Sequence, residues 1–380
     1  WFDCRAQKEH SITIRVPDEG QLLRAATVDA SGLIEHFALS PGGRRAVFAA
    51  RGELLTVPKE HGDVRNLTRS PGAHDKQPAY SPDGRTIAFV SDRTGEEQIW
   101  LSDHLGKEPA RQLTKGLAVM LYTPLWSPDG KWIAFGDKDG VLRLANVESG
   151  ELTVIADEVR GQIGDATWSP CSGHLAFSLT NDAELRTLQI YSLADRSLHA
   201  ISRPLANDST PAFDARGERL FFLGLRGFAP RLAQDYEWDF QIDRAYGIFA
   251  LALRKDLPAW LPPRSDEAEK PAEPAPAAPK FEQPIPIDFE GLADRVEAVP
   301  VPLDNYGSLQ CTATGLLFTR RGGSYYGRDT DRSTTLHGFS REDRKEEQLA
   351  SGVGGFAVSP EGTHVLFRSG STFTITEAST

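Results

Sequence analysis

The residues of this 380-residue chain that could do chemistry are dispersed along it. The nine histidines stand singly, and no GxSxG, HExxH or GxxxxGK[ST] motif occurs, nor a GxGxxG that follows a strand. Cys4, Cys171 and Cys311 lie far apart without CxxC spacing, which predicts incidental thiols rather than a disulfide framework or a zinc site. We therefore expect no catalytic residue, no metal and no cofactor in this chain.

Two short stretches are candidates for contact with a peptide. Asp235 and Trp238 belong to a run of carboxylates and aromatic rings that suits a basic or unfolded peptide, or else folds back on a sheet edge. Arg320 and Arg321 follow an expected strand pair, and guanidinium groups suit a peptide carboxylate. The alternative for this pair is a solvated loop tip.

Composition excludes some functions. The net charge of −11 and the lack of clustered Lys and Arg argue against a nucleic-acid partner. No stretch approaches the ~20 apolar residues of a membrane span. The chain begins with Trp1 rather than Met, so we expect a piece of a longer protein, and the missing signal peptide says little about its compartment. A cytoplasmic location is our expectation.

The elements that must position these residues follow a repeat of about 45 residues. Its signature is a Ser-Pro-Asp-Gly turn, in which Pro presets φ, Asp accepts backbone N–H groups and Gly tolerates a positive φ. A buried β run follows each turn. The copies begin at Ser40, Ser81, Ser127, Ser169, Asp214 and Ser359, with a degenerate copy near 311–315.

Apolar residues flank the turns at fixed positions. A phenylalanine stands eight residues after the start of six turns, and in the degenerate copy Phe318 comes about two residues early. A second apolar position immediately precedes each turn. Both sets are predicted to form the packing layers between sheets. They comprise Phe48, Phe89, Phe135, Phe177, Phe222 and Phe367, and Leu39, Tyr80, Trp126, Trp168, Phe213 and Val358.

A third set of residues, four positions before each turn, is polar or small while its neighbours are apolar. We call it the polar column. In a radial array of sheets the innermost strand faces a central channel, and a wet channel wall explains such residues. Ordinary strand alternation with the polar side outward is the alternative. The polar column consists of His36, Gln77, Thr123, Asp165, Thr210 and Gly355.

Four short strands per unit and seven units predict an all-β, seven-bladed propeller of four-stranded antiparallel blades over residues 31–380. A Pro-, Ala- and Glu-rich insertion spans about 224–300 in the fifth blade, with a mobile part at about 262–284. Residues 1–30 form a segment of their own. Within them Ser11 to Val16 either pairs with the last blade and closes the ring or ends a preceding domain.

The turn and the strand after it resemble the PD40 repeat of TolB, of prolyl-oligopeptidase-type propellers and of tricorn proteases. Further runs are similar to the seven-bladed propeller of tricorn-type proteases. These runs are 50–58, 65–72, 91–96, 253–258 and 287–292.

The tricorn resemblance implies a non-catalytic propeller of a serine peptidase that guides short unfolded peptides to an active site. That site would lie in peptidase domains that follow a PDZ-like module, so no catalytic residue carries over to this chain. Peptides, those domains and further copies in a homo-oligomer are the implied partners. The alternatives are a stand-alone TolB-like binding propeller and the propeller of a prolyl-oligopeptidase-type hydrolase, which would bring a GxSxG motif.

Overall fold

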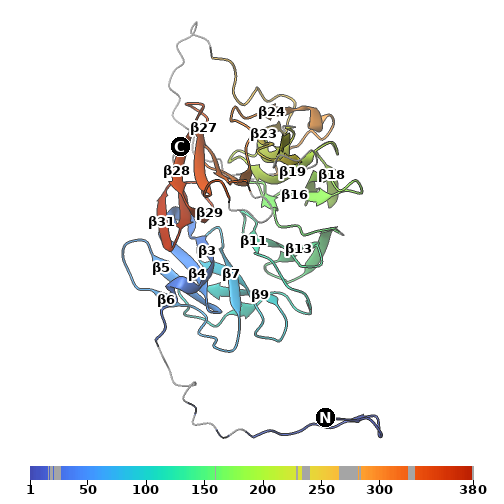
Figure 1. Ribbon diagram of the computed structural model, residues 1–380, viewed down its shortest axis with the longest axis vertical. Coiled ribbons are helices and arrows are strands. Elements are labelled where there is room, and N and C mark those ends of the chain that lie inside the picture. Colours follow the sequence, from blue (N-terminus) through green and yellow to red (C-terminus); the bar gives the residue numbers. More distant parts are fainter. Residues whose placement is uncertain are drawn as a thin grey trace.

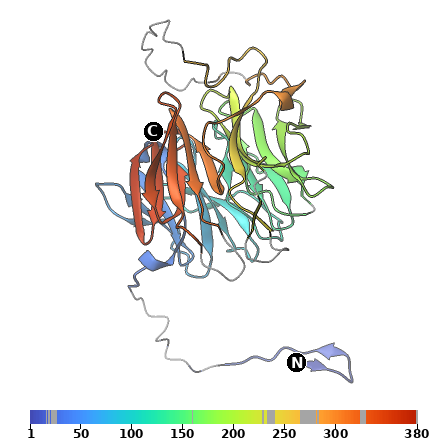
Figure 2. The same ribbon diagram turned by 45° about the horizontal axis from the view of Figure 1, so that its top comes forward.

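The computed structural model describes residues 1–15, 17, 20, 27–158, 160–227, 230–232, 240–264, 281, 284–323 and 330–378. Over these ranges the chain forms seven antiparallel sheets in a ring, which we number as blades one to seven in chain order (Figures 1 and 2). The predicted seven-bladed, all-β propeller is confirmed. Within these ranges three short 3-10 turns accompany the strands: η2 (Ser31–Leu33), η3 (Pro41–Gly43) and η4 (Leu292–Asp294).

Within each blade the strands follow one another from the innermost to the outermost. Blades one to three are β3 (Ile34–Leu39), β4 (Arg45–Ala50), β5 (Glu53–Pro58) and β6 (Arg65–Asn66); β7 (Asp75–Tyr80), β8 (Thr86–Ser91), β9 (Gln98–Asp103) and β10 (Arg111–Gln112); β11 (Leu125–Trp126), β12 (Trp132–Gly136), β13 (Val141–Asn146) and β14 (Leu152–Asp157). Blade four is β15 (Thr167–Trp168), β16 (His174–Thr180), β17 (Arg186–Ser192) and β18 (Ser197–Ala200).

Blade five keeps four strands although the chain leaves it twice. The short hairpin of β21 (Pro230–Leu232) and β22 (Phe240–Ile242) separates its second and third strands. Blades five to seven are β19 (Asn207–Phe213), β20 (Arg219–Leu225), β23 (Tyr246–Ala252) and β24 (Val296–Ala298); β25 (Tyr306–Cys311), β26 (Gly315–Arg320), β27 (Thr335–Ser340) and β28 (Lys345–Ser351); β29 (Val353–Val358), β30 (His364–Ser369) and β31 (Thr372–Glu377).

The repeated turn has the predicted chemistry. The hydroxyl of Ser81 accepts a hydrogen bond from Thr86 N (3.0 Å), and the Asp83 carboxylate accepts one from Arg85 N (3.1 Å). Gly84 has φ +71° and donates its N–H to the Ser81 carbonyl at 2.9 Å. These bonds satisfy the backbone of the turn and fix the register between the two innermost strands of blade two.

The degenerate turn of blade six is two residues shorter. Thr312 N donates to the carbonyl of Gly315, whereas Ser81 N donates to that of Thr86. This difference explains why Phe318 comes two residues early and is nevertheless completely buried. The phenylalanine after the turn therefore reaches the same buried position in blade six although the turn there is shorter.

The core lies between blades rather than within them. Val47 and Leu54 of blade one pack with Ile87 and Phe89 of blade two in one buried cluster, and similar clusters fill other junctions. In blades three and four the tryptophan before the turn adds a polar link to the preceding blade. Trp126 Nε1 donates to the Ala79 carbonyl and Trp168 Nε1 to the Leu125 carbonyl, both at 3.1 Å.

Blades seven and one close the ring through side chains. The ring of Phe373 meets Phe48 at 4.8 Å and Phe37 at 5.2 Å between centroids, edge to face, and Leu366 is buried in the same cluster. Among the described residues β31 has no outer partner strand. Residues 11–15 are exposed and outside any strand, and Val16 lies outside the described residues.

The N-terminal residues form a separate hairpin of β1 (Phe2–Asp3) and β2 (Lys8–Glu9), which Figure 1 shows away from the propeller. Between β23 and β24 the chain crosses the turns of blades four and five. There Ile285 is buried and its N–H donates to Cys171 Sγ at 3.3 Å. Most of the stretch predicted to be mobile, 265–280 and 282–283, lies outside the described residues.

The link between blades three and four is testable. Trp168→Phe keeps the aromatic packing but leaves the Leu125 carbonyl without its N–H donor, so we expect a loss of about 1 kcal/mol in unfolding free energy. Urea denaturation followed by circular dichroism measures it. Trp1→Phe, at a position 62% exposed, is the matched control. Equal stability of the Trp168 variant and the wild type would contradict an energetic role for this bond.

Candidate functional site

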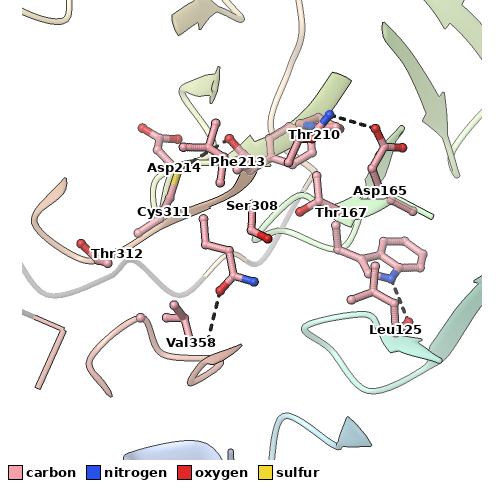
Figure 3. Close-up of a pocket in the computed structure, with 18 of the residues that line it drawn as sticks. Leu125, Asp165, Thr167, Thr210, Phe213, Asp214, Ser308, Cys311, Thr312 and Val358 are labelled. Carbon is pink, nitrogen blue, oxygen red and sulfur yellow. Dashed lines mark hydrogen bonds between the residues drawn. The ribbon is translucent and has the colours of Figure 1, made fainter. Parts of the chain in front are cut away.

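A cavity of about 990 Å³ lies among the innermost strands of blades three to seven (Figure 3). Strands β11, β15, β19 and β25 and the turns that follow them provide its wall, together with the end of β29. The cavity therefore occupies the centre of the ring, where a propeller has its channel.

The innermost strand of blade four is short: β15 has two residues, as β11 of blade three has, whereas β19 has seven. Upstream of β15 the chain leaves the sheet. Carboxylates replace the missing strand as acceptors for β16: Asp165 accepts from Ser178 N at 3.1 Å, and Glu158 accepts from Thr180 N. The inner strand of blade four is therefore shorter, but the amides of Ser178 and Thr180 still have hydrogen-bond acceptors.

Asp165 also joins blade four to blade five. Its second carboxylate oxygen accepts a hydrogen bond from Thr210 N at 2.9 Å, as Figure 3 shows. Thr210 has φ +54° and lies in a bulge of β19 between Ser209 and Ala212. The bulge turns this amide away from β20 and toward the neighbouring blade.

The structure brings two members of the polar column together at the cavity, Asp165 and Thr210. The other four lie on or beside the innermost strands of their own blades and do not line it: His36, Gln77, Thr123 and Gly355. Burial lowers the pKa of the half-buried His36 imidazole. Gln77 has φ +52° in a bulge of β7, as Thr210 has in β19.

Blade six contributes residues that the sequence reasoning missed. Ser308 is exposed although it lies on the innermost strand β25, and it lines the cavity. It stands four residues before Thr312, so counting back from the degenerate turn would have placed it in the polar column. Gln310, also in the wall, accepts a hydrogen bond from Val358 N at 3.1 Å and so joins blades six and seven.

The two predicted arginines have different surroundings. Arg320 forms an ion pair with Glu346 and lies 3.6 Å from Asp304, and its guanidinium stacks on the ring of Tyr306. Arg321 lines the cavity instead. The other two candidates for peptide contact, Asp235 and Trp238, lie outside the described residues.

Burial and hydrogen bonds shift several titrating groups near the cavity. Burial raises the pKa of the Asp214 carboxyl in the blade-five turn, and it raises that of the Cys311 thiol well above its ordinary value. Burial also raises the pKa of the Cys171 thiol, but hydrogen bonds to the sulfur outweigh this effect. Hydrogen bonds with the His174 side chain, Ile285 N and other donors lower its pKa to about 7.

No group of three or more metal-ligating side chains gathers in the described part of the chain. Nor does any helix there have the length and apolarity needed to cross a membrane.

A ring of seven antiparallel sheets around a central cavity, with a repeated turn between the two innermost strands of each sheet, defines the class of seven-bladed β-propellers. The model of one family, the second β-propeller domain of tricorn protease, matches residues 34–379. The chain belongs to this family.

The relatives are consistent with this assignment, and a solved structure shares the fold. The chain is 27% identical over 337 residues to tricorn protease homolog 1 of Streptomyces coelicolor, which covers 85% of this chain and 32% of the relative. It is 24% identical over 350 residues to tricorn protease of Thermoplasma volcanium (89% and 32%). The crystal structure of the tricorn protease superposes with a TM-score of 0.75 at 17% identity, covering 99% of this chain and 36% of that one.

The chain therefore spans about a third of the length of these curated relatives. A TolB homolog of Chlorobium chlorochromatii is 31% identical over 148 residues, which covers 38% of this chain and 32% of the relative.

The thiol of Cys171 gives a testable pH dependence. Because the thiolate is the nucleophile, alkylation by iodoacetamide should rise with pH with a midpoint near 7 rather than at the ordinary 9.0. Mass spectrometry of a Cys4→Ser variant follows Cys171, with the half-buried Cys311 as an internal control that should react only at much higher pH because its pKa is raised. His174→Phe removes the side chain that lowers this pKa most and should raise the midpoint. A midpoint near 9 in the wild type would contradict this assignment.

Proposed function

We propose that this chain is the non-catalytic propeller of a tricorn-like serine peptidase. In this proposal it guides short unfolded peptides through its centre toward an active site in other domains of the same polypeptide. The observation that carries it is the central cavity, whose wall consists of innermost strands and turns and exposes polar side chains such as Ser308 and Thr210.

The size of the cavity supports selection by shape. An extended peptide needs about 3.3 Å per residue along a strand, so the six residues of β25 offer room for about 20 Å of peptide. A folded domain of 100 residues has a radius of gyration of about 13 Å and does not enter a space of about 990 Å³. Unfolded peptides are the substrates that fit.

The extent of the similarity favours a tricorn-like parent over a stand-alone TolB-like binding protein. The tricorn match covers most of the chain, whereas the TolB match covers less than half of it. Because the chain spans about a third of those tricorn relatives, we propose that PDZ-like and peptidase domains lie elsewhere in the native polypeptide.

The first experiment is an immunoblot of the native source with an antibody to this chain. A tricorn-like parent predicts a band at about three times the mass of this chain, since the chain spans 32% of the relatives. A band at the mass of the chain alone, 41.7 kDa, would overturn the peptidase proposal in favour of a stand-alone binding propeller.

Passage through the cavity is tested in the native full-length protein. Ser308→Trp places an indole in the cavity, so we expect kcat/KM for hydrolysis of unfolded peptides of about ten residues to fall about tenfold. Ser371→Trp, the same substitution at an exposed turn of blade seven, is the control and should leave hydrolysis unchanged. Thermal unfolding confirms that both variants are folded. Unchanged hydrolysis in a folded Ser308 variant would show that peptides do not pass this way.

A further inference from the structure

The neighbourhood of Arg321 is rich in arginines that acidic groups neutralise. Arg321 N donates to the Asn305 carbonyl, and the guanidinium of Arg332 donates to the Arg321 carbonyl. The paired arginines there and their carboxylates are Arg244 with Asp243 and Asp331, Arg320 with Glu346, and Arg332 with Asp304. Among the described residues the Arg321 guanidinium is the one in this group without an acidic partner.

Arg321 is held against the wall of the cavity. Its side chain lies over Gly307 of β25, where an added Cβ would come within 2.7 Å of Arg321 Nε and closer still to Thr319 Oγ1. Glycine at this position of the inner strand therefore leaves room for the Thr319 hydroxyl and for the guanidinium that lies across it. The side chain is exposed, and the surface to which it is exposed includes the cavity.

The opposite end of the cavity has the opposite charge. Arg321 directly follows β26, whereas Glu361 lies in the turn after β29, at the other end of the blades. Both line the cavity, and Glu361 is exposed. An inner strand of six residues, about 20 Å, separates the two ends. The cavity therefore has the polarity of a zwitterionic peptide of about this length.

We propose that Arg321 binds the C-terminal carboxylate of an extended peptide, whose amino end is directed toward Glu361. A planar guanidinium donates two parallel N–H···O bonds to a carboxylate, and among the described residues no acid occupies those donors at Arg321. This inference rests on the proposed function, since it takes a peptide as the occupant of the cavity. It makes the free carboxylate, rather than any one side chain, the feature that the propeller recognises.

The test measures binding of a hexapeptide of alanine and serine with a fluorophore on one central lysine, by fluorescence anisotropy with the 380-residue chain. The peptide is prepared with a free C-terminal carboxylate and as the C-terminal amide. For the wild type we expect the acid to bind about tenfold more tightly than the amide. Arg321→Gln should abolish that difference, and Arg321→Lys should retain part of it, because it keeps the charge without the planar fork.

The matched control is Arg186→Gln, which removes an exposed arginine at the start of β17 outside the cavity and should leave the preference for the acid intact. Equal affinity of acid and amide for the wild type would overturn the carboxylate site and leave the proposed passage standing. Binding of neither peptide would overturn the proposed passage and the carboxylate site together. A preference that persists in a folded Arg321→Gln variant would also overturn the site.

The direction of the peptide has its own readout. Acetylation of the amino terminus should weaken binding to the wild type but not to Glu361→Gln, because the lost ammonium charge then has no carboxylate to face. An equal effect of acetylation on both proteins would contradict the proposed direction while leaving the carboxylate site intact.

Discussion

Packing between sheets is the constraint on which this propeller depends, because among the described residues no backbone ladder joins one blade to the next. Each junction is filled by buried apolar side chains such as Phe89 and Phe177, which belong to the second strands of their blades. Hydrogen bonds from the residue before a turn, such as Trp168 to the Leu125 carbonyl, add direction to this packing. The hydrophobic effect sets no direction, so at the junctions of blades two, three and four these polar links add a directional contact that orients one blade on the next.

Most of the fold could be predicted from the sequence because both of its determinants are local and repeated. Ser-Pro-Asp-Gly turns specify where each pair of strands meets, and the phenylalanine eight residues later marks the buried strand. The two-residue shift at Phe318 was visible in the sequence, and its cause is the shorter turn at Thr312. How the ring closes could not be predicted from the sequence, because the alternating polar and apolar residues at 11–16 are equally compatible with a closing strand and with the end of a preceding domain.

The candidate site was less predictable because it depends on departures from the repeat. Asp165 and Thr210 meet at the cavity since β15 is short and β19 is bulged, and neither feature has a sequence signal in this chain. Arg320 and Arg321 are adjacent and identical in type. Glu346 lies across blade six where it neutralises Arg320, whereas Arg321 lines the cavity. Such pairings depend on long-range geometry that spacing along the chain does not encode.

The junction of blades seven and one differs from the others in mechanical terms. Elsewhere a continuous chain runs from the last strand of one blade to the first of the next, so covalent bonds span the junction. Here β3 begins the propeller and β31 ends it, and Figure 2 shows the first and last blades side by side. A pull on the two ends of the propeller therefore loads the contacts around Phe373 directly. Tension applied at these two ends would act on this seam first, since the other six junctions are also bridged by the chain itself.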